Sequence, residues 1–575
     1  MGLKLFRSTG YGSLLDTQTA ATWQKQAKLG PMGRNPVAML AVVSLWLATV
    51  ANLALWRELG RLGQLQSAGG YAFAVAFAAI IFGALCALGA LLAWRRSIKP
   101  VLVCLCLAAA LGMHFMLSYG VVIDTTMIVN VLQTDPRETR DLLSWKLLFT
   151  VLIVAGVPSL WLWRQNVQRL TWPRQALRNL VFGTAGCIII AVAMALSFQT
   201  FSSNMRNHTQ LRYLINPLNS LYALTNLATK PLRKGPMPML SLAEDAKLGA
   251  SYALPANKPP LMVLVVGETA RAGNFGINGY ARQTTPELAA LSSTERMASM
   301  RNVWSCGTST ATSLPCMFSH LGKDGFESRN SNYENLVDVL QRAGLAVLWL
   351  DNQSGCKGLC DRIPNAYTTG GKDPKLCPSG ECFDAIMLDK LDERIAALSA
   401  AQRANGVVVV LHQMGSHGPA YYKRVPQAFK KFTPECASNA LQDCSREQVV
   451  NSYDNTIAYT DHFLATTIKW LKTKEGNSQT AMVYVADHGE SLGENNIYLH
   501  GLPYAIAPDV QKRVPWITWL SSSFAARSKV DVACLNSRAD IRTTHDNYFH
   551  SVVGLLDVKT SVYRRDWDVY APCVK

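Results

Sequence analysis

The sequence predicts an N-terminal five-helix transmembrane bundle followed by a C-terminal α/β domain. The chain of 575 residues is 49% hydrophobic and only 17% charged, which is typical of proteins with a membrane part. Its first 200 residues contain five long apolar runs and carry 17 basic against 6 acidic residues. After residue 260, strand-like runs alternate with helical stretches, which predicts a sheet covered by helices. Because most of the positive charge lies in the hydrophobic part, the composition argues against nucleic-acid binding.

Five apolar runs before residue 201 are each close to the ~20 residues that cross a bilayer as a helix. They are Pro36–Trp56, Tyr71–Trp94, Val101–Ile123, Leu147–Trp163 and Asn179–Phe198. The fourth run is the shortest and contains Pro158. The first 35 residues are mostly polar, so we expect the first run to be an uncleaved anchor. Residues 1–200 are therefore predicted to be a transmembrane domain; the alternative is a set of buried core helices in a soluble protein.

The distribution of Lys and Arg between the short loops predicts the orientation. The N-terminal tail and the second and fourth loops hold 12 basic residues and one acidic residue, Asp16. The first and third loops together hold five basic and five acidic residues. Because positively charged loops stay on the cytoplasmic side, the N-terminus is predicted inside and everything after residue 200 outside.

Ten of the 14 cysteines lie after residue 300, an even number in one predicted extracytoplasmic domain. Several fall at short spacings, namely Cys306/Cys316, Cys356/Cys360, Cys377/Cys382 and Cys436/Cys444, and Cys534 and Cys573 remain. We interpret them as five disulfides formed in an oxidising compartment, with the connectivity left open by the sequence. The competing interpretation is a four-thiolate zinc site built from the cysteines between 356 and 382.

Residues 201–260 connect the two parts. Gln210–Ala228 has apolar residues at helical spacing, and Pro217 is expected to break or kink it. Basic and aromatic residues lie beside its apolar stripe, so the segment is predicted either to lie on lipid headgroups or to be an ordinary docking helix. Five prolines between 236 and 260 indicate a linker before the α/β domain of residues 261–575.

Four apolar, β-branched runs in the C-terminal domain predict buried parallel strands. They are Leu261–Val266, Ala346–Leu350, Val407–Leu411 and Ala481–Val485. Helical stretches lie between them, at Asn335–Ala343, Ala385–Leu398 and Val449–Trp470, and predict a doubly wound sheet. In such sheets ligands bind at the carboxyl ends of the strands.

Acidic and histidine residues follow each of these four strands. The strand ends and the residues just beyond them hold Glu268, Asp351, His412, His417, Asp487, His488 and His500. A single Asp–His pair after a strand is more often a cap or a turn, but four such ends at one sheet edge are hard to explain by packing. The mixed carboxylate and imidazole set predicts a hydrolytic or transfer-type metal site for zinc or manganese.

The segment Cys306-Gly-Thr-Ser-Thr-Ala-Thr-Ser-Leu-Pro-Cys316 is the candidate loop for a nucleophile because it is rich in hydroxyl groups. A sulfatase-type C/S-x-P-x-R signature, a G-x-S-x-G elbow, an H-E-x-x-H helix and a phosphate-binding G-x-x-x-x-G-K-S/T loop are absent from the sequence. A Ser or Thr hydroxyl activated by the metal remains, because a metal lowers the pKa of a hydroxyl and neutralises phosphoryl oxygens. Taken alone, the segment would be a surface loop closed by a disulfide.

Five motifs in order carry a resemblance to a known family. They are Val266-Gly-Glu-Thr-Ala-Arg-Ala-Gly-Asn-Phe-Gly-Ile-Asn-Gly-Tyr280, the Cys306–Cys316 loop, His412-Gln-Met-Gly-Ser-His-Gly-Pro419, Asp487-His-Gly-Glu-Ser-Leu-Gly-Glu494 and Tyr498-Leu-His-Gly501. With them the whole chain, including its five spans, resembles the phosphoethanolamine–lipid A transferases, which include the mobile colistin-resistance enzymes. The resemblance implies an alkaline phosphatase/sulfatase-like domain that faces the periplasm from the bacterial inner membrane.

The resemblance also implies roles for the strand-end residues. The family nucleophile, four residues after the first Cys of the loop, corresponds to Thr310. The family zinc ligands correspond to Glu268, Thr310, Asp487 and His488. His417 and His500 are expected to bind the phosphate, a second zinc ion, or both, so that the enzyme holds one zinc ion or two. His417 is also the candidate acid for the leaving oxygen.

Further positions match residues that contact the lipid substrate. Lys357 and Gln353 correspond to positions near the headgroup, although an Asn is familiar at the position of Gln353. Asn130, Thr134 and Glu138, in the third loop between spans, match positions that contact the ethanolamine lipid. His412 is a further expected substrate-binding residue.

The implied reaction consists of two in-line phosphoryl transfers. Thr310 attacks phosphatidylethanolamine, diacylglycerol leaves, and a lipid A phosphate then takes the phosphoethanolamine from Thr310. The added ammonium group makes the outer membrane less anionic, which implies resistance to polymyxin and other cationic peptides. A monomer that binds the membrane, the donor lipid and lipid A is expected.

Three alternatives stay open. The same group could be transferred to a lipopolysaccharide core sugar or another periplasmic glycan. A membrane-bound phosphodiesterase or lipoteichoic-acid-type polymerase shares the layout, but the ten-cysteine pattern fits it poorly. A non-catalytic membrane sensor would be favoured by loss of Glu268, Thr310, Asp487 or His488, and all four are present.

Overall fold

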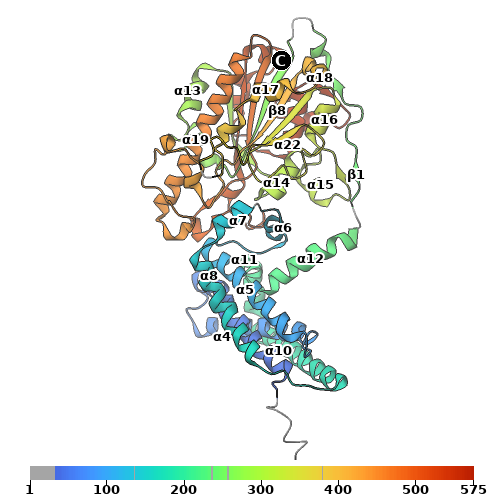
Figure 1. The fold of residues 1–575 in the computed structure, drawn as a ribbon, viewed down its shortest axis with the longest axis vertical. Coiled ribbons are helices and arrows are strands. Elements are labelled where there is room, and N and C mark those ends of the chain that lie inside the picture. The colour runs from blue at the N-terminus through green and yellow to red at the C-terminus, as the bar shows by residue number, and fades with distance from the viewer. Residues whose placement is uncertain (1–32, 135, 235–236, 255–257, 379) are drawn as a thin grey trace, which may run out of the picture. The chain divides into compact units, whose positions relative to one another are not determined.

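The computed structural model describes residues 33–575 apart from 135, 235–236, 255–257 and 379 (Figure 1). The contacts divide the chain into two units. The helical unit contains residues up to 113, 148–211 and 215–218, and the sheet unit contains residues 114–147, 212–214 and 219–575. The segment 114–147 between two spans thus groups with the C-terminal residues, so the boundaries at 200 and 260 stay a prediction. The basic residues of the N-terminal tail before 33 lie outside the described residues.

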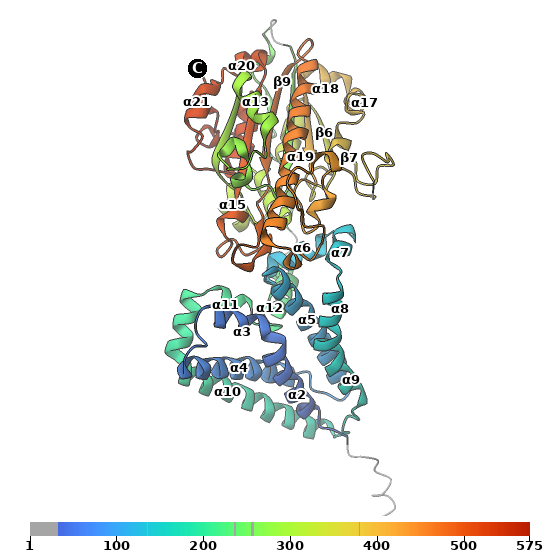
Figure 2. The same cartoon turned by 90° about the vertical axis from the view of Figure 1, so that its left-hand side faces the viewer.

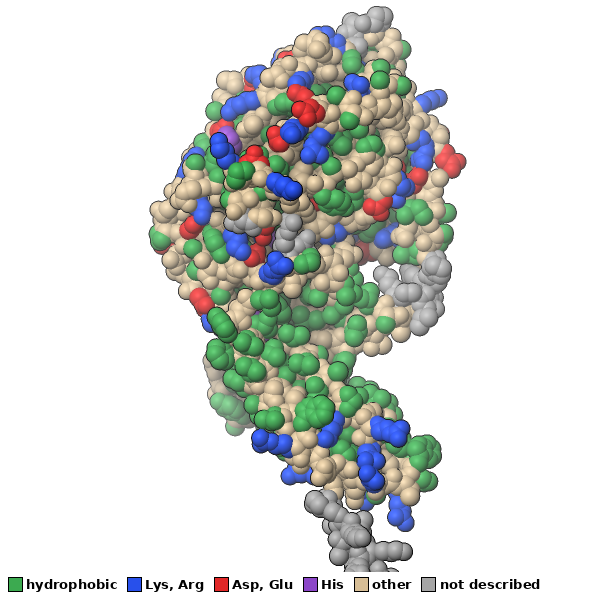
Figure 3. All heavy atoms as spheres, viewed as in Figure 1, with side chains coloured by type: hydrophobic (Ala, Val, Ile, Leu, Met, Phe, Trp, Pro, Cys, Tyr) green, Lys and Arg blue, Asp and Glu red, His purple; other side chains and the backbone are tan. Residues whose placement is uncertain are grey.

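Five described helices are long and apolar enough to cross a membrane, and each contains most or all of one predicted run. They are Pro36–Arg61, Ala68–Ala90 (α4), Ile98–Tyr119 (α5), Trp145–Arg164 and Trp172–Asn207 (α10). The first comprises α2 (Pro36–Thr49), η1 (Val50–Asn52) and α3 (Leu53–Arg61). The fourth comprises α8 (Trp145–Val151), the π-helical η2 (Leu152–Gly156) and α9 (Val157–Arg164). Many large apolar side chains of the helical unit are exposed, as Figure 3 shows.

Pro158 explains why the fourth span is irregular. A proline has no backbone N–H and crowds the carbonyl four residues earlier, here that of Val154. The helix widens to π geometry over Leu152–Gly156, directly before Pro158. The Trp46 indole N–H donates a hydrogen bond to the Val154 carbonyl at 3.0 Å. The neighbouring span thus satisfies the acceptor that the proline leaves open.

Apart from the shared start at Pro36, the bounds of the spans differ from the predicted runs by one to nine residues, and two of the differences concern α5 and α10. Helix α5 stops at Tyr119, four residues before the predicted end, because Gly120 adopts the left-handed conformation with φ +68°. Helix α10 is 36 residues long and extends beyond the predicted apolar run at both ends. The connector forms two helices on either side of Pro217, α11 (Gln210–Tyr213) and α12 (Leu218–Lys234), so the predicted break is confirmed.

An eight-stranded sheet organises the sheet unit. Its order is β13-β4-β12-β9-β3-β8-β6-β7. The strands are β3 (Pro260–Gly267), β4 (Met297–Trp304), β6 (Ala346–Asp351), β7 (Asn365–Tyr367), β8 (Val407–His412), β9 (Gln479–Ala486), β12 (Arg513–Leu520) and β13 (Thr543–Thr544). The four predicted strands are β3, β6, β8 and β9, and they form the continuous parallel centre of the sheet.

The sheet is mixed rather than fully parallel, because β12 runs antiparallel to both β9 and β4. Neither β4 nor β12 was predicted. Strand β4 places polar residues such as Arg301 and Asn302 among its apolar ones, and β12 contains Pro515. Proline cannot donate to a strand ladder, and the pairing of β12 with β4 shifts register between Val514 and Trp516. Pro515 thus argues against a strand at a position where the sheet accommodates it by a shift in register.

Helices cover both faces of the sheet. Figure 1 shows α13 (Pro286–Thr294) and α19 (Arg446–Thr473) on one side and α16 (Leu336–Arg342) and α22 (Asp546–Leu555) on the other. The remaining helices are α6 (Thr125–Gln133), α7 (Pro136–Leu142), α14 (Thr310–Met317), α15 (Gly322–Ser328), α17 (Leu391–Ala396), α18 (Ala400–Asn405), α20 (Ser522–Ser528) and α21 (Val532–Ser537). Helix α6 packs against α14, and both views show α6 and α7 beside one end of this unit (Figures 1 and 2).

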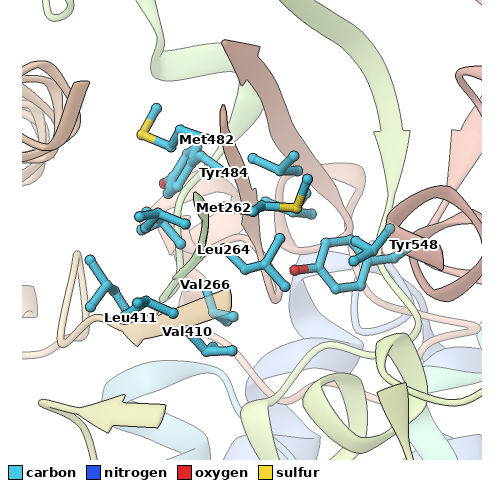
Figure 4. Packing of buried hydrophobic residues seen from close by; sticks show 14 of the residues in the cluster. Met262, Leu264, Val266, Val410, Leu411, Met482, Tyr484 and Tyr548 are labelled. Atoms are coloured by element: carbon cyan, nitrogen blue, oxygen red, sulfur yellow. The ribbon is translucent and has the colours of Figure 1, made fainter. Parts of the chain in front are cut away.

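The sheet faces form one apolar core. Met262, Leu264 and Val266 of β3 pack beside residues of β8 and β9 and near Tyr548 of α22, as Figure 4 shows. All residues of β3, β6, β8 and β9 are buried, as expected for parallel strands with both faces covered. This core fixes the strand ends on which the site is built.

The ten cysteines of the sheet unit form five disulfides. The pairs are Cys306–Cys316, Cys356–Cys360, Cys377–Cys382, Cys436–Cys444 and Cys534–Cys573. A thiolate zinc site between 356 and 382 is therefore not formed. The four remaining cysteines, Cys86, Cys104, Cys106 and Cys187, are free thiols in the candidate spans.

Candidate functional site

The carboxyl ends of β3 and β9 bring three charged side chains into contact. Glu268 follows β3, and Asp487 and His488 follow β9, the neighbouring parallel strand. One ligand atom from each of the three lies within 4.8 Å of the others. All three side chains are fully buried. They are three of the strand-end residues from which the sequence predicts a metal site, and the family resemblance implies these three, with Thr310, as the zinc ligands.

One nitrogen of His488 points at the centre of this group. The Nδ1 of His488 lies 2.9 Å from the Gly489 carbonyl, which can only accept a hydrogen bond, so Nδ1 carries the proton. The other ring nitrogen, Nε2, therefore faces Glu268 Oε1 at 3.3 Å and Asp487 Oδ2 at 3.4 Å, where it holds a proton when no metal is bound and would bind the metal through its lone pair. A backbone carbonyl that orients a ring in this way is the usual support of a metal-ligating histidine.

Thr310 is the hydroxyl that reaches the same group. Its Oγ1 donates to Glu268 Oε2 at 3.0 Å and lies 3.4 Å from His488 Nε2. Thr310 is the first residue of α14, so the N–H groups of that helix end lie next to its hydroxyl. A helix N-terminus favours negative charge, including a phosphoryl group.

Burial and mutual charge shift the pKa values of the three charged groups. Burial and the charge of Glu268 raise the pKa of Asp487 to about 6. Burial opposes protonation of His488, but Asp487 and Glu268 outweigh it and raise the pKa of that ring to about 10. Burial also acts to raise the pKa of Glu268, but the hydrogen bond and charge of His488 hold it below its usual range. Two buried carboxylates thus bind a positive charge tightly.

The donor set fits a divalent cation such as zinc. Asp487 Oδ2 is buried and accepts no hydrogen bond from any described residue, as expected of an oxygen that binds an ion. Two carboxylates, one imidazole and a hydroxyl are oxygen and nitrogen ligands that zinc accepts. Glu268, Thr310, Asp487 and His488 would hold the ion.

Two further histidines lie next to this group. The rings of His488 and His500 are 4.5 Å apart, and those of His500 and His417 are 5.3 Å apart. His500 Nδ1 lies 2.9 Å from Glu490 Oε2, a carboxylate that leaves Nε2 of the ring as the basic nitrogen. Sequence reasoning did not assign a role to Glu490, although it is the fourth residue of the Asp-His-Gly-Glu motif.

The His417 imidazole is neutral at neutral pH. Burial and the neighbouring positive charges of His500, Arg424 and His488 lower its pKa to about 3, despite the opposing charge of Glu268. A neutral ring keeps one N–H to donate and one lone pair to accept. It supplies less driving force for protonating a leaving group than an imidazolium would.

A cavity of about 140 Å³ opens beside Thr310. The expected residues Asn130, Thr134, Thr310, Gln353, Lys357, His417 and His500 line it together with Phe115, Tyr119, Ile123, Met127, Val131, Leu142 and Leu499. All belong to the sheet unit, so its wall comes from the segment 114–147 and its floor from the strand ends. Glu138 lies on α7, and its side chain is outside the described residues. The lining thus combines polar residues such as Thr310 and Lys357 with apolar residues of α5 and α6.

His412 is not among the residues that line this cavity. Its side chain is fully buried, and its Nδ1 lies 2.8 Å from Asp351 Oδ2. His412 is the last residue of β8 and pairs in register with Val266 and Asp351. It therefore supports the site from within the sheet rather than from the cavity, a difference that a strand-end pattern cannot resolve.

Comparison with family models matches both parts of the chain. A model described as Sulfatase matches residues 260–558, and one described as Phosphoethanolamine transferase EptA/EptB matches residues 81–232. Phosphoethanolamine transferase EptA of Salmonella typhimurium is 36% identical over 546 residues, which cover 93% of this chain and 97% of that protein. Phosphatidylethanolamine transferase Mcr-1 of Escherichia coli is 37% identical over 534 residues, covering 91% and 95%.

Solved structures agree with these matches. The integral membrane protein lipooligosaccharide phosphoethanolamine transferase A (EptA) of Neisseria meningitidis has a TM-score of 0.88 and 34% identity, and the alignment covers 94% of this chain and 99% of that one. The soluble domain of the same protein has a TM-score of 0.55 and 42% identity and covers 59% of this chain.

Proposed function

Because the chain belongs to the phosphoethanolamine transferase family of EptA and Mcr, we propose that it moves phosphoethanolamine from phosphatidylethanolamine to a phosphate of lipid A. The protein is an integral membrane protein with a C-terminal periplasmic domain. The cavity that joins Thr310 to an apolar wall carries the proposal, because a lipid headgroup needs both surfaces. The expected family residues around Thr310 support it.

In the first half-reaction, the Thr310 oxygen attacks the phosphorus of phosphatidylethanolamine. The Thr310–phosphorus bond forms, the bond from phosphorus to the glycerol oxygen breaks, and diacylglycerol leaves. Overall, the Thr310 proton ends on the glycerol oxygen. Glu268, which accepts the hydrogen bond of Thr310, and His417, which lines the cavity, are the candidate carriers of that proton. A bound zinc ion would lower the pKa of the hydroxyl and neutralise phosphoryl charge.

In the second half-reaction, an acceptor oxygen attacks the phosphoethanolamine–Thr310 intermediate. The bond to Thr310 breaks, Thr310 regains a proton, and the group ends on the acceptor. A lipid A phosphate is the acceptor that we favour, and a core sugar or another periplasmic glycan is the alternative. The product carries an added ammonium group, so the outer membrane attracts polymyxin-like cationic peptides less.

Several contacts favour a lipid donor over a small soluble phosphoester. Apolar residues of α5 and α6 line the cavity, and a small soluble phosphodiester has no apolar group for them to bind. Lys357 and Gln353 also line the cavity and are polar groups that a phosphate and an amine can bind. A membrane-bound phosphodiesterase would use the same first step, with water in place of the acceptor.

Mass spectrometry of lipid A tests the proposal. Cells that express the native chain are compared with cells that express Thr310→Ala and with Thr312→Ala, a matched control two residues along the same helix. We expect a phosphoethanolamine addition to lipid A with the native chain and with Thr312→Ala, and its loss with Thr310→Ala. Unchanged lipid A together with a modified core sugar would show that the core sugar is the acceptor. The absence of phosphoethanolamine from lipid A and from every other glycan in all strains would contradict the proposed transfer.

A further inference from the structure

A buried ion pair joins the segment 114–147 to the rest of the sheet unit. Asp141, near the end of α7, lies 3.4 Å from an Arg424 guanidinium nitrogen, measured from Asp141 Oδ2. Their side chains are 5% and 4% exposed. Asp141 also pairs with Lys423, and Arg424 also pairs with Glu381. Two cations and two carboxylates therefore balance each other at this point.

Arg424 also contacts the backbone of a cavity residue. Its Nε donates a hydrogen bond to the His417 carbonyl at 3.2 Å. His417 lies in the loop that follows β8, and its ring lines the cavity together with Thr310 and His500. One guanidinium thus links α7, the segment around the Cys377–Cys382 disulfide and the His417 loop.

The His417 loop is held at both ends. Before His417, the Ser416 N–H donates to the Glu268 carbonyl at 3.0 Å, and the Gly415 N–H donates to Asp384 at 3.0 Å. After it, the Tyr421 hydroxyl donates to Glu490 Oε1 at 2.7 Å, and Arg424 bonds the carbonyl of His417 itself. The attachments to Glu268 and Asp384 lie at the sheet edge, whereas Arg424 is held by Asp141 of α7 and by Glu381. The position of His417 is therefore coupled to the segment that supplies Asn130 and Thr134 to the cavity wall.

Because Asp141 and Arg424 are buried, loss of either charge should disturb the structure around them. Taking charged groups out of water is costly unless each has a partner and its hydrogen bonds are made. Removal of the Asp141 charge would leave the buried Arg424 guanidinium to Glu381 alone and would leave Lys423 without its carboxylate. The side chains would rearrange toward water, and the His417 carbonyl would lose its donor.

We propose that Asp141 and Arg424 are positioning residues for the transfer reaction, which hold the lipid-facing segment and the His417 loop in the one arrangement that completes the cavity. The inference rests on the proposed function, because it assigns the donor headgroup to that cavity. Neither residue lines the cavity, so both act through His417 and through α6 and α7.

A second ion pair on the same segment provides a matched control. Lys146 pairs with Asp443, and so also joins the segment 114–147 to the rest of the unit. Its side chains are 52% and 45% exposed, and exposed pairs contribute little. Both pairs join the segment 114–147 to later residues of the sheet unit, but only the Asp141–Arg424 pair is buried and bonded to the His417 carbonyl.

The test follows the first half-reaction of the full-length protein in proteoliposomes containing phosphatidylethanolamine. The rate at which the Thr310 peptide gains phosphoethanolamine is measured for the native chain, Asp141→Asn, Asp141→Glu and the control Lys146→Gln. We expect Asp141→Asn to lower kcat/KM about tenfold or more and Asp141→Glu to recover part of the loss. Lys146→Gln should keep the native rate. An Asp141→Asn variant that melts with the native protein and reacts at the native rate would overturn the proposal.

If Asp141→Asn does not fold, the variant Arg424→Lys tests the proposal in its place. A lysine keeps the positive charge between the two carboxylates. Its single ammonium nitrogen cannot bond both carboxylates and the His417 carbonyl, whereas the three nitrogens of a guanidinium can. A folded Arg424→Lys variant with native kinetics contradicts a positioning role, and a loss of about tenfold in kcat/KM supports it. A native chain that forms no phosphoethanolamine–Thr310 adduct would instead refute the proposed function.

Discussion

The floor and the wall of the cavity beside Thr310 are built in opposite ways. The floor includes Thr310, whose hydroxyl contacts Glu268 and His488, two fully buried side chains that follow adjacent parallel strands and are fixed by the core of the sheet. The wall consists of residues from α5 and α6 that range from buried Tyr119 to exposed Val131, more than a hundred positions earlier in the sequence. It is joined to the rest of the unit by ion pairs such as Asp141–Arg424 and Lys146–Asp443. The difference implies that the floor sets the chemistry and the wall selects the substrate.

Metal removal should have the largest effect, because it acts on the floor. Glu268→Gln and Asp487→Asn each remove a charged ligand, so we expect loss of bound zinc and a fall in kcat of about a thousandfold or more. Chelation of the native protein should do the same, and zinc should restore the activity. Elemental analysis and transfer assays check both effects, with Asp540→Asn, a carboxylate that is 73% exposed, as control. Native activity in a zinc-free Glu268→Gln protein would contradict the assignment of the floor.

A change in the wall should affect substrate binding while leaving the metal in place. Asn130 lines the cavity, so Asn130→Ala should raise the KM for phosphatidylethanolamine about tenfold, which corresponds to the loss of one hydrogen bond or two. Thr126→Ala, an exposed position on the same helix, should not change KM. Zinc content should be native in both variants. A fall in kcat with unchanged KM would place Asn130 in the chemistry instead of in binding.

Stability of the floor should depend on pH through His545, which lies beneath the nucleophile loop. Its Nδ1 accepts from the Cys306 N–H at 3.2 Å, and its Nε2 lies 3.0 Å from the Ala486 carbonyl, so the ring is neutral. Burial, together with the charge of His488, lowers its pKa from 6.5 to about 3. Because the unfolded chain then binds more protons, stability is complete above pH 6.5 and falls as the pH drops toward 3.

The size of this effect follows from the shift. At pH 5 the loss from His545 should be about 2 kcal/mol, at ~1.4 kcal/mol for each pH unit below 6.5. Denaturant unfolding of the native protein and His545→Asn between pH 5 and 8 measures it. The variant should be less stable at pH 8 but should lose less stability on acidification. Equal slopes for the two proteins would contradict a neutral, buried His545.

The exposed ion pair of the wall should have the smallest effect. Lys146→Gln removes the pair with Asp443, and both side chains are about half exposed. We expect the free energy of unfolding to change by no more than about 0.5 kcal/mol, because water and salt screen such pairs. Denaturant unfolding at low and high salt checks the value. A loss of several kcal/mol would mean that exposure does not separate the two ion pairs of the wall.

The sequence predicts the floor better than the wall, for a physical reason. Glu268, Asp487 and His488 each follow a continuous apolar strand, so the strand pattern alone brings them to one edge. No periodicity predicts that Asn130 and Thr134, between two spans, line a cavity with Thr310. Only the family resemblance indicated those positions, because long-range contacts of a half-exposed segment leave no local pattern.

The features of the sheet unit that the sequence did not predict also have physical explanations. Strand β12 contains Pro515 at its register shift, and a proline within an apolar run argues against a strand. His412 follows the same kind of strand as the site residues, but its side chain turns to Asp351 in the interior. Arg424 looks like an ordinary basic residue beside Lys423, because its two carboxylate partners come from distant segments.

One measurement tests the central claim most directly. The purified full-length protein is incubated with phosphatidylethanolamine, the peptide that contains Thr310 is analysed by mass spectrometry, and lipid A is then added. We predict that Thr310 gains phosphoethanolamine, and that the group leaves the peptide and appears on lipid A in equal amount. Phosphoethanolamine on lipid A without any modification of Thr310, in a protein quenched at early times, would contradict the account.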